Sequence, residues 1–146
     1  MGKQAEDFFT RLEEASILDA IRQAETDSSG EVRVHVENHC KGDVMERAAE
    51  VFDLLKMQKT KLRNGVLFYL AIEDRKFAIL GDAGINAKVA DDFWDTIKEH
   101  LAANFKEEKF AKGMAEGIIM AGEQLKEHFP YMDDDVNELS DDISYA

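Results

Sequence analysis

The sequence has 146 residues, a formal net charge of −13, 45% hydrophobic residues and 34% charged residues. These values predict one globular domain that buries its own core, and the lone Cys40 excludes an internal disulfide and a cysteine-based zinc site. The negative charge argues against nucleic acid as a partner, because contacts with phosphates need a basic surface.

Helix and strand patterns alternate over the first part of the chain. Apolar residues at helical spacing predict a helix over residues 6–24, which ends in a polar turn at residues 26–30. The run EVRVHVEN, residues 31–38, has valine at every second position and predicts a strand with one polar face. A second helix is indicated over residues 43–55, with Asp43 as its N-cap.

Two strands and two helices are predicted for the rest of the domain. The run NGVLFYLAI, residues 64–72, is almost continuously apolar, as a strand covered on both faces would be. KFAIL, residues 76–80, follows closely and predicts a hairpin with it. Amphipathic helices are predicted over residues 86–104 and 108–129, and Pro130 marks the end of the second.

Beyond the last helix, residues 132–146 contain six acidic residues and no basic one. We interpret this segment as a disordered, solubilising tail. A helix needs an apolar run of about 18 residues to cross a bilayer, and no run in this sequence approaches that length. No transmembrane segment is therefore expected. Acidic residues near the N-terminus stand where a secretory signal needs an apolar core, and a cytoplasmic protein is therefore expected.

The order of these elements predicts which loops meet. A strand, helix, strand unit crosses over right-handedly and makes the first two strands parallel, while the hairpin makes the third strand antiparallel to both. The starts of the first two strands and the end of the third then lie at one end of a small mixed sheet. Glu31, Asn64 and Asp82 are therefore expected to face one another.

Several short motifs resemble the TPM domain family over residues 28–128. They are Ser29-Gly30-Glu31 before the valine-rich strand, Asn64-Gly65-Val66-Leu67, Asp74-Arg75-Lys76, Gly81-Asp82-Ala83-Gly84-Ile85, and the late pattern of Phe105, Phe110, Gly113 and Gly117. The resemblance implies a three-layer α/β/α sandwich, with residues 1–131 as a single domain of the cytoplasmic bacterial branch. Some members of the family are credited with divalent-cation binding and acid phosphatase activity. Relatives tend to carry an acidic residue at the position of Arg63.

The turn GDAGIN, residues 81–86, is the first candidate site. Asp82 and Asn86, beside Glu31 and Asn64, would supply the hard oxygen ligands that Ca²⁺ or Mg²⁺ prefers, with Asp91 as a further carboxylate. The alternative is a turn that only its glycines permit, in which Asn86 caps the next helix and Asp91 lies near that helix's first turn. Gly81 and Gly84, which belong to the same turn, are further ligand-binding candidates.

The segment KMQKTKLR, residues 56–63, is the second candidate site. It holds four cations in an acidic protein, and Lys61 and Arg63 are expected beside the turn at Asp82. A phosphate or an acidic partner could bind there. The alternative is that the lysines complement the end of a helix and the remainder is a solvated loop.

Three functions agree with these features. The leading hypothesis is a domain that binds a divalent cation or an acidic ligand and interacts with another protein, with family analogy suggesting membrane or stress-related quality control. The second is a metal-dependent acid phosphatase, in which Glu31, Asp82 and Asp91 hold the ion and Lys61 or Arg63 offsets charge. The third is a scaffold that uses its acidic tail. The sequence assigns no catalytic residue.

Overall fold

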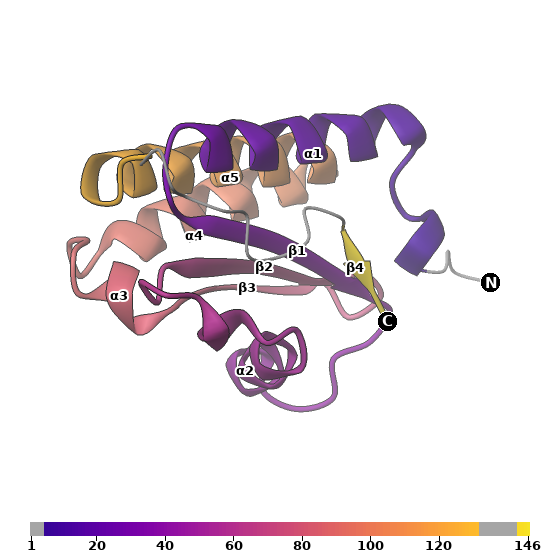
Figure 1. The fold of residues 1–146 in the computed structure, drawn as a ribbon. Coiled ribbons are helices and arrows are strands. Elements are labelled where there is room, and N and C mark those ends of the chain that lie inside the picture. The colour runs from indigo at the N-terminus through magenta and orange to yellow at the C-terminus, as the bar shows by residue number, and fades with distance from the viewer. Residues whose placement is uncertain (1–4, 132–142) are drawn as a thin grey trace.

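Helices cover both faces of a central mixed sheet in the computed structural model, which describes residues 5–131 and 143–146 (Figure 1). The elements in chain order are η1 (Ala5–Asp7), α1 (Arg11–Thr26), β1 (Glu31–Glu37), α2 (Val44–Leu54), η2 (Met57–Lys59), β2 (Gly65–Ala71), β3 (Lys76–Gly81), α3 (Ala83–Asn86), α4 (Phe93–Lys106), α5 (Phe110–His128) and β4 (Ser144–Tyr145). None of the helices described is long and apolar enough to cross a membrane.

The sheet has the strand order β3-β2-β1-β4. β1 and β2 are parallel, with Glu31 opposite Gly65, and β2 and β3 are antiparallel, with Val66 opposite Gly81. This register confirms the predicted parallel pair with an antiparallel hairpin strand, and the α/β class with it. The starts of β1 and β2 and the end of β3 lie at one end of the sheet.

β4 is the part of the sheet that the sequence analysis missed. The segment 132–146 was predicted to be a disordered tail, but within it residues 144 and 145 form a strand parallel to β1. The prediction is therefore wrong for residues 143–146, and residues 132–142 lie outside the described part of the chain. Four residues are too few to show a periodic pattern, and their acidic neighbours dominate the local composition.

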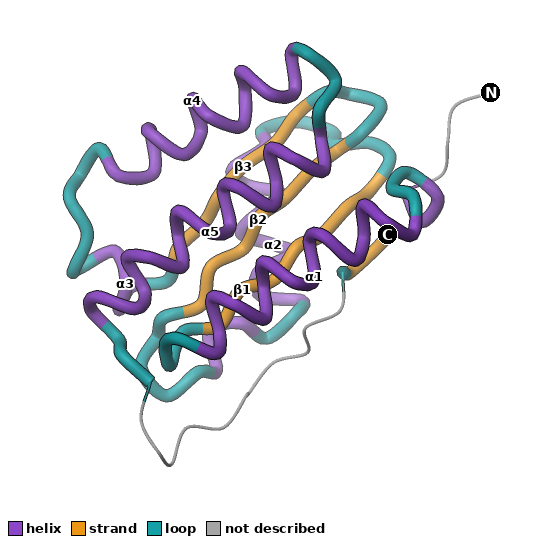
Figure 2. Tube along the Cα trace, turned by 90° about the horizontal axis from the view of Figure 1, so that it is seen from above, coloured by secondary structure: helices purple, strands orange, loops and turns teal. Residues whose placement is uncertain are grey.

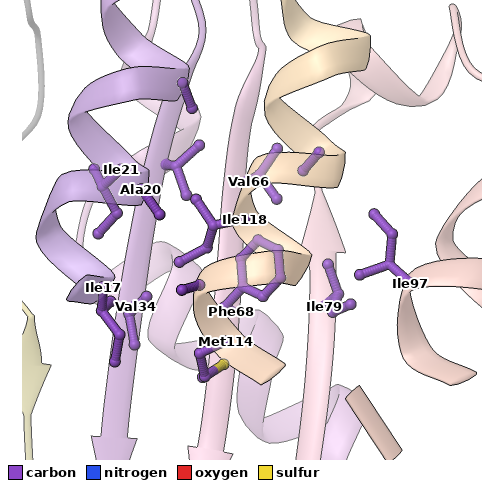
Figure 3. Packing of buried hydrophobic residues seen from close by; sticks show 14 of the residues in the cluster. Ile17, Ala20, Ile21, Val34, Val66, Phe68, Ile79, Ile97, Met114 and Ile118 are labelled. Carbon is purple, nitrogen blue, oxygen red and sulfur yellow. The ribbon is translucent and has the colours of Figure 1, made fainter. Parts of the chain in front are cut away.

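Two hydrophobic clusters form the core, one on each face of the sheet. α1, α5 and α4 lie side by side over one face, and α2 covers the other (Figure 2). Along β2, Val66, Phe68 and Leu70 point into the larger cluster, shown in part in Figure 3, while Leu67 and Tyr69 belong to the smaller one. All seven residues of β2 are buried, which explains why this strand reads as a continuous apolar run.

Two predicted helices begin elsewhere in the structure. α1 starts at Arg11, because Thr10 and Glu13 form a reciprocal capping box at that point. The helix predicted to begin at residue 86 begins only at Phe93, as α4, because the short α3 ends at Asn86 and turns lie between the two helices. Apolar residues continue at four-residue spacing across the intervening turns, so periodicity alone could not reveal the break.

Candidate functional site

Three chain segments meet at the end of the sheet where β1 and β2 begin. The amide of Asp82 donates to the carbonyl of Gly65 at 2.9 Å, and the amide of Glu31 donates to the carbonyl of Asn64 at 3.5 Å. The side chain of Asn64 donates to the carbonyl of Ser29 at 3.2 Å. Glu31, Asn64 and Asp82 are all buried. The predicted convergence is confirmed, whereas a ligand for these residues stays a prediction.

Close packing explains the glycines of the turn at residues 81–86. A Cβ atom on Gly84 would lie 2.1 Å from the carbonyl oxygen of Leu62, and one on Gly81 would lie 2.5 Å from a ring carbon of Trp94. The alternative from the sequence, that Asn86 caps the next helix, is wrong. The Asn86 side chain instead donates to the carbonyl of Gly81 and accepts from the indole of Trp94, both at 2.8 Å. Asp82 caps α3 instead, by accepting from the amide of Ala83.

A bidentate ion pair joins the two candidate segments. Arg63 donates from Nε to Oδ2 of Asp82 and from Nη2 to Oδ1, both at 2.8 Å. The Asp82 side chain is only 5% exposed, whereas that of Arg63 is 51% exposed. The hydrogen bonds from Arg63 to Asp82, and the attraction between their charges, raise the pKa of Arg63. The sequence had placed both residues at this end of the sheet but had not paired them.

A shallow pocket of about 260 Å³ opens beside this ion pair. Its walls come from α2, η2, the segment before β2 and the end of β3, and it is lined by Ala49, Phe52, Asp53, Gln58, Arg63, Leu80, Gly81 and Asp82. Gln58 donates to Asp53 at 2.8 Å. Lys56, Lys59 and Lys61 are exposed on the chain between α2 and β2. One cation, Arg63, and two carboxylates, Asp53 and Asp82, therefore line a partly apolar hollow.

The three carboxylates predicted to hold a metal ion differ in burial and in their partners, and their role as metal ligands stays a prediction. Both oxygens of Asp82 accept hydrogen bonds from Arg63, so a cation would have to displace a guanidinium or bind next to it. Asp91 lies on an exposed turn before α4, and Glu31 is buried at the start of β1. Within residues 5–131 and 143–146, no group of three or more His, Cys, Asp or Glu side chains is placed to hold a metal ion.

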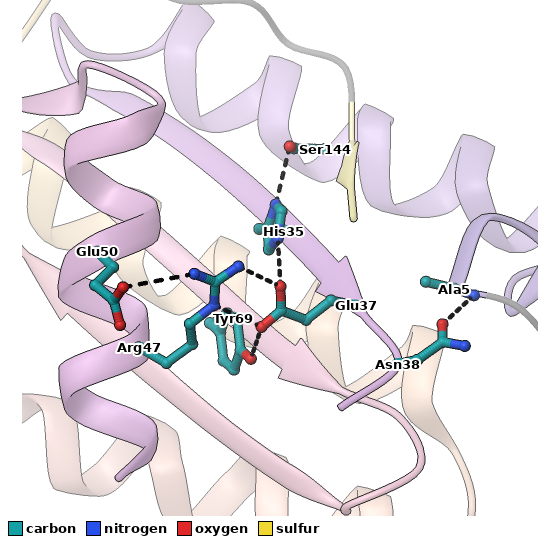
Figure 4. Close-up of polar contacts among 8 residues, drawn as sticks. All are labelled: Ala5, His35, Glu37, Asn38, Arg47, Glu50, Tyr69 and Ser144. Carbon is teal, nitrogen blue, oxygen red and sulfur yellow. Dashed lines mark hydrogen bonds and ion pairs between the residues drawn. The ribbon is translucent and has the colours of Figure 1, made fainter. Parts of the chain in front are cut away.

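A second polar cluster, which the sequence analysis did not identify, lies at the opposite end of β1 (Figure 4). Glu37 accepts two hydrogen bonds from Arg47, both at 2.8 Å, and a short one from the Tyr69 hydroxyl. His35 places Nε2 3.3 Å from Glu37 and Nδ1 2.9 Å from the Ser144 hydroxyl. A tyrosine inside an apolar run was the available signal, because a buried phenol needs a hydrogen-bond partner.

Burial and hydrogen bonding fix the charges in this cluster. Burial alone would raise the pKa of Glu37, but hydrogen bonds from Arg47, Tyr69 and His35 outweigh it and lower the pKa to about 2. Burial lowers the pKa of His35 despite its contact with Glu37. At neutral pH the cluster therefore holds an ionised Glu37 against Arg47 and a neutral imidazole, an arrangement that ties β1, β2 and α2 together.

A comparison with protein families identifies one family. A family model described as the TPM domain matches residues 3–124. The solved NMR structure of BA42 protein from the psychrophilic bacterium Bizionia argentinensis shares 50% identity with a TM-score of 0.88, over 95% of this chain and 96% of that chain. The search of curated proteins found no match.

More distant solved structures share the fold. The N-terminal domain of a protein from P. gingivalis has 18% identity and a TM-score of 0.70, over 86% of this chain and 83% of that one. The N-terminal domain of a Corynebacterium glutamicum protein has 15% identity and a TM-score of 0.65, over 80% of this chain and 74% of that one. At such low identity, these two likenesses bear on the fold alone.

Proposed function

This chain belongs to the TPM domain family, and on that premise we propose that it binds an acidic group of a partner protein at the pocket beside Arg63. We call Lys56, Lys59, Lys61 and Arg63 the cationic rim. Its ligand is a phosphate or carboxylate group, and its role is that of an interaction module. The ion pair between Arg63 and Asp82 is the observation that carries the proposal.

Asp82 makes Arg63 a preorganised anion receptor. The carboxylate engages Nε and Nη2, so the guanidinium is held in one orientation while half of the side chain stays exposed. Among the described residues, Nη1 of Arg63 makes no hydrogen bond, and it remains available for an anion. A rigid guanidinium loses little conformational entropy when it binds a planar or tetrahedral oxyanion.

The charge of the segment that supplies Arg63 also favours an anion over a cation. Arg63 lines the pocket together with the carboxylates Asp53 and Asp82, and the segment 56–63 that carries it holds four cations and no acidic residue. Because the whole chain carries a formal charge of −13, this is a local reversal of sign. Such a reversal selects an acidic ligand and steers it to one face of an otherwise repellent surface.

Backbone amide shifts during a titration with inorganic phosphate test the proposal. In the wild type, amides of Asn64, Gly81 and Gly84 are expected to shift at millimolar phosphate and constant ionic strength. Arg63→Gln should abolish these shifts. Arg75→Gln is the matched control, because Arg75 is also an exposed arginine with a left-handed backbone, at the opposite end of β2.

Arg63→Gln leaves Asp82 buried without its partner and could therefore misfold. A second variant tests phosphate binding without this change. Lys59→Gln/Lys61→Gln leaves the ion pair intact and should weaken phosphate binding by about tenfold through lost attraction. Phosphate that moves no rim amide in the wild type would contradict the proposal. A parallel titration with Ca²⁺ or Mg²⁺ is the second measurement. If these ions shift the amides of Asp82 and Gly84 and phosphate does not, the site binds a cation and not an anion.

A further inference from the structure

β4 occupies the edge of the sheet that β1 would otherwise expose. It is parallel to β1, with Ser144 opposite His35 and Tyr145 opposite Val36, and the amide of Ala146 donates to the carbonyl of Val36 at 3.0 Å. β1 spans seven residues and β4 only two. The edge is therefore occupied by a very short strand, and short strands add few contacts to a sheet.

Side chains on both strands give this contact specificity. The Ser144 hydroxyl lies 2.9 Å from Nδ1 of His35, whose other ring nitrogen faces Glu37. The His35 ring also stacks on Tyr69, with ring centroids 6.0 Å apart, so its orientation is set without β4. Ile143 and Tyr145 pack against the larger hydrophobic cluster. An aliphatic, a hydroxyl and an aromatic side chain are thus recognised in succession.

Neighbouring segments limit the length of the exposed edge. Near the start of β1, the amide of Val32 donates to the Glu25 side chain at 3.0 Å. Just beyond the end of β1, the side chain of Asn38 accepts from the amide of Ala5 at 2.7 Å. The part of the edge that can accept another strand is the short stretch around His35 and Val36. Such a site suits a peptide of about four residues, at the spacing of an extended chain.

We propose that this edge of β1 is a strand-addition site for an extended segment of another protein, which residues 143–146 occupy in cis. The ligand chemistry is a branched aliphatic residue, then serine or threonine, then an aromatic residue, running parallel to β1. Strand addition to an exposed sheet edge is a common mode of peptide recognition, in which the main chain provides affinity and side chains provide specificity.

Repulsion between negative charges favours the exchange of residues 143–146 for a segment of another protein. Residues 132–142 connect β4 to the rest of the chain, and their sequence contains six acidic residues and no basic one. The remainder of the chain is also net negative, so like charges oppose the return of residues 143–146 to the sheet. A partner peptide without this charge would compete against a strand of only two residues.

Backbone amide shifts of a full-length Ser144→Pro variant test the proposal. Proline removes the amide of residue 144 and should release β4, so the amides of His35, Val36 and Glu37 are expected to shift. Ser140→Pro makes the same substitution outside residues 143–146 and should leave these amides in place. A capped synthetic peptide with the sequence of residues 141–146 should then bind the released variant and restore the wild-type positions.

The comparison with the wild type decides whether the cis segment competes. The wild type should require at least about tenfold more peptide than Ser144→Pro, because its own segment holds the site. A peptide with serine in place of its tyrosine should bind at least about tenfold more weakly, since the aromatic contact is lost.

Three results would overturn the proposal. The first is that Ser144→Pro leaves the amides of His35 and Val36 unchanged. The second is that millimolar peptide fails to shift them in the released variant. The third is a concentration-dependent dimer of the wild type that the peptide dissociates, which would make a second copy of this chain the occupant instead of a different protein.

Discussion

Replacing Glu37 by Gln is expected to destabilise the fold by about 3 kcal/mol at neutral pH. The pKa of Glu37 lies at about 2 instead of the usual 4.5, because hydrogen bonds from Arg47, Tyr69 and His35 outweigh the effect of burial. Each pKa unit corresponds to about 1.4 kcal/mol of free energy. The Glu37 side chain is only 7% exposed, so solvent screens its interactions with these partners only weakly. Removing one partner of a buried pair also leaves Arg47 without its main counter-charge.

The dependence on pH identifies the source of this stability. Since the pKa of Glu37 is lower in the folded state than in the unfolded state, the contribution is complete above pH 4.5 and is lost as the pH falls towards 2. About 2 kcal/mol should be lost by about pH 3. The wild type and Glu37→Gln should therefore converge in stability as the solution is acidified.

Urea unfolding at several pH values measures the difference. Glu50→Gln is the matched control, because Glu50 lies 3.8 Å from the other side of the Arg47 guanidinium but is 67% exposed. It should change the free energy of unfolding by less than about 0.5 kcal/mol. A stability difference between the wild type and Glu37→Gln that stays constant down to about pH 3 would refute the assignment to the ionised carboxylate.

Two further variants probe the turn at residues 81–86 and the docking of β4. Gly84→Ala should lower the free energy of unfolding by about 1–3 kcal/mol in urea, because the new Cβ would meet the carbonyl of Leu62. Helix propensity alone would favour alanine by about 1 kcal/mol, so a gain in stability would contradict the packing argument. The Tyr145 ring should titrate with a pKa of about 12, raised by burial and then by Glu14, when followed by NMR. In Ser144→Pro the Tyr145 ring should titrate with a pKa of about 10, and a wild-type pKa of about 10 would show that Tyr145 is not packed as described.

The strands and their directions were predictable because each depends on a local pattern and a general rule. Alternating valines identified β1, a continuous apolar run identified β2, and the handedness of the crossover made them parallel. From these alone, Glu31, Asn64 and Asp82 could be placed at one end of the sheet. The register confirms that placement.

The pairing of side chains at that end could not be derived in the same way. Arg63 and Asp82 are 19 residues apart, and their bidentate contact depends on the left-handed backbone of Arg63 and on the path of the turn before β2. The sequence therefore supplied a cation and a carboxylate in the same neighbourhood. It did not reveal that the carboxylate is engaged by Arg63, and this contact is the reason why we propose an anion instead of a metal ion as the ligand.

Local patterns along the chain were enough to predict the family, the helices and strands with strong periodicity, and the end of the sheet where three loops meet. The ion pair of Arg63 with Asp82, the buried cluster around Glu37 and the addition of β4 to β1 became visible only in the folded protein. The physical reason is separation along the chain. Periodicity shows which face of a single element is buried, whereas these three contacts join side chains or strands from different elements.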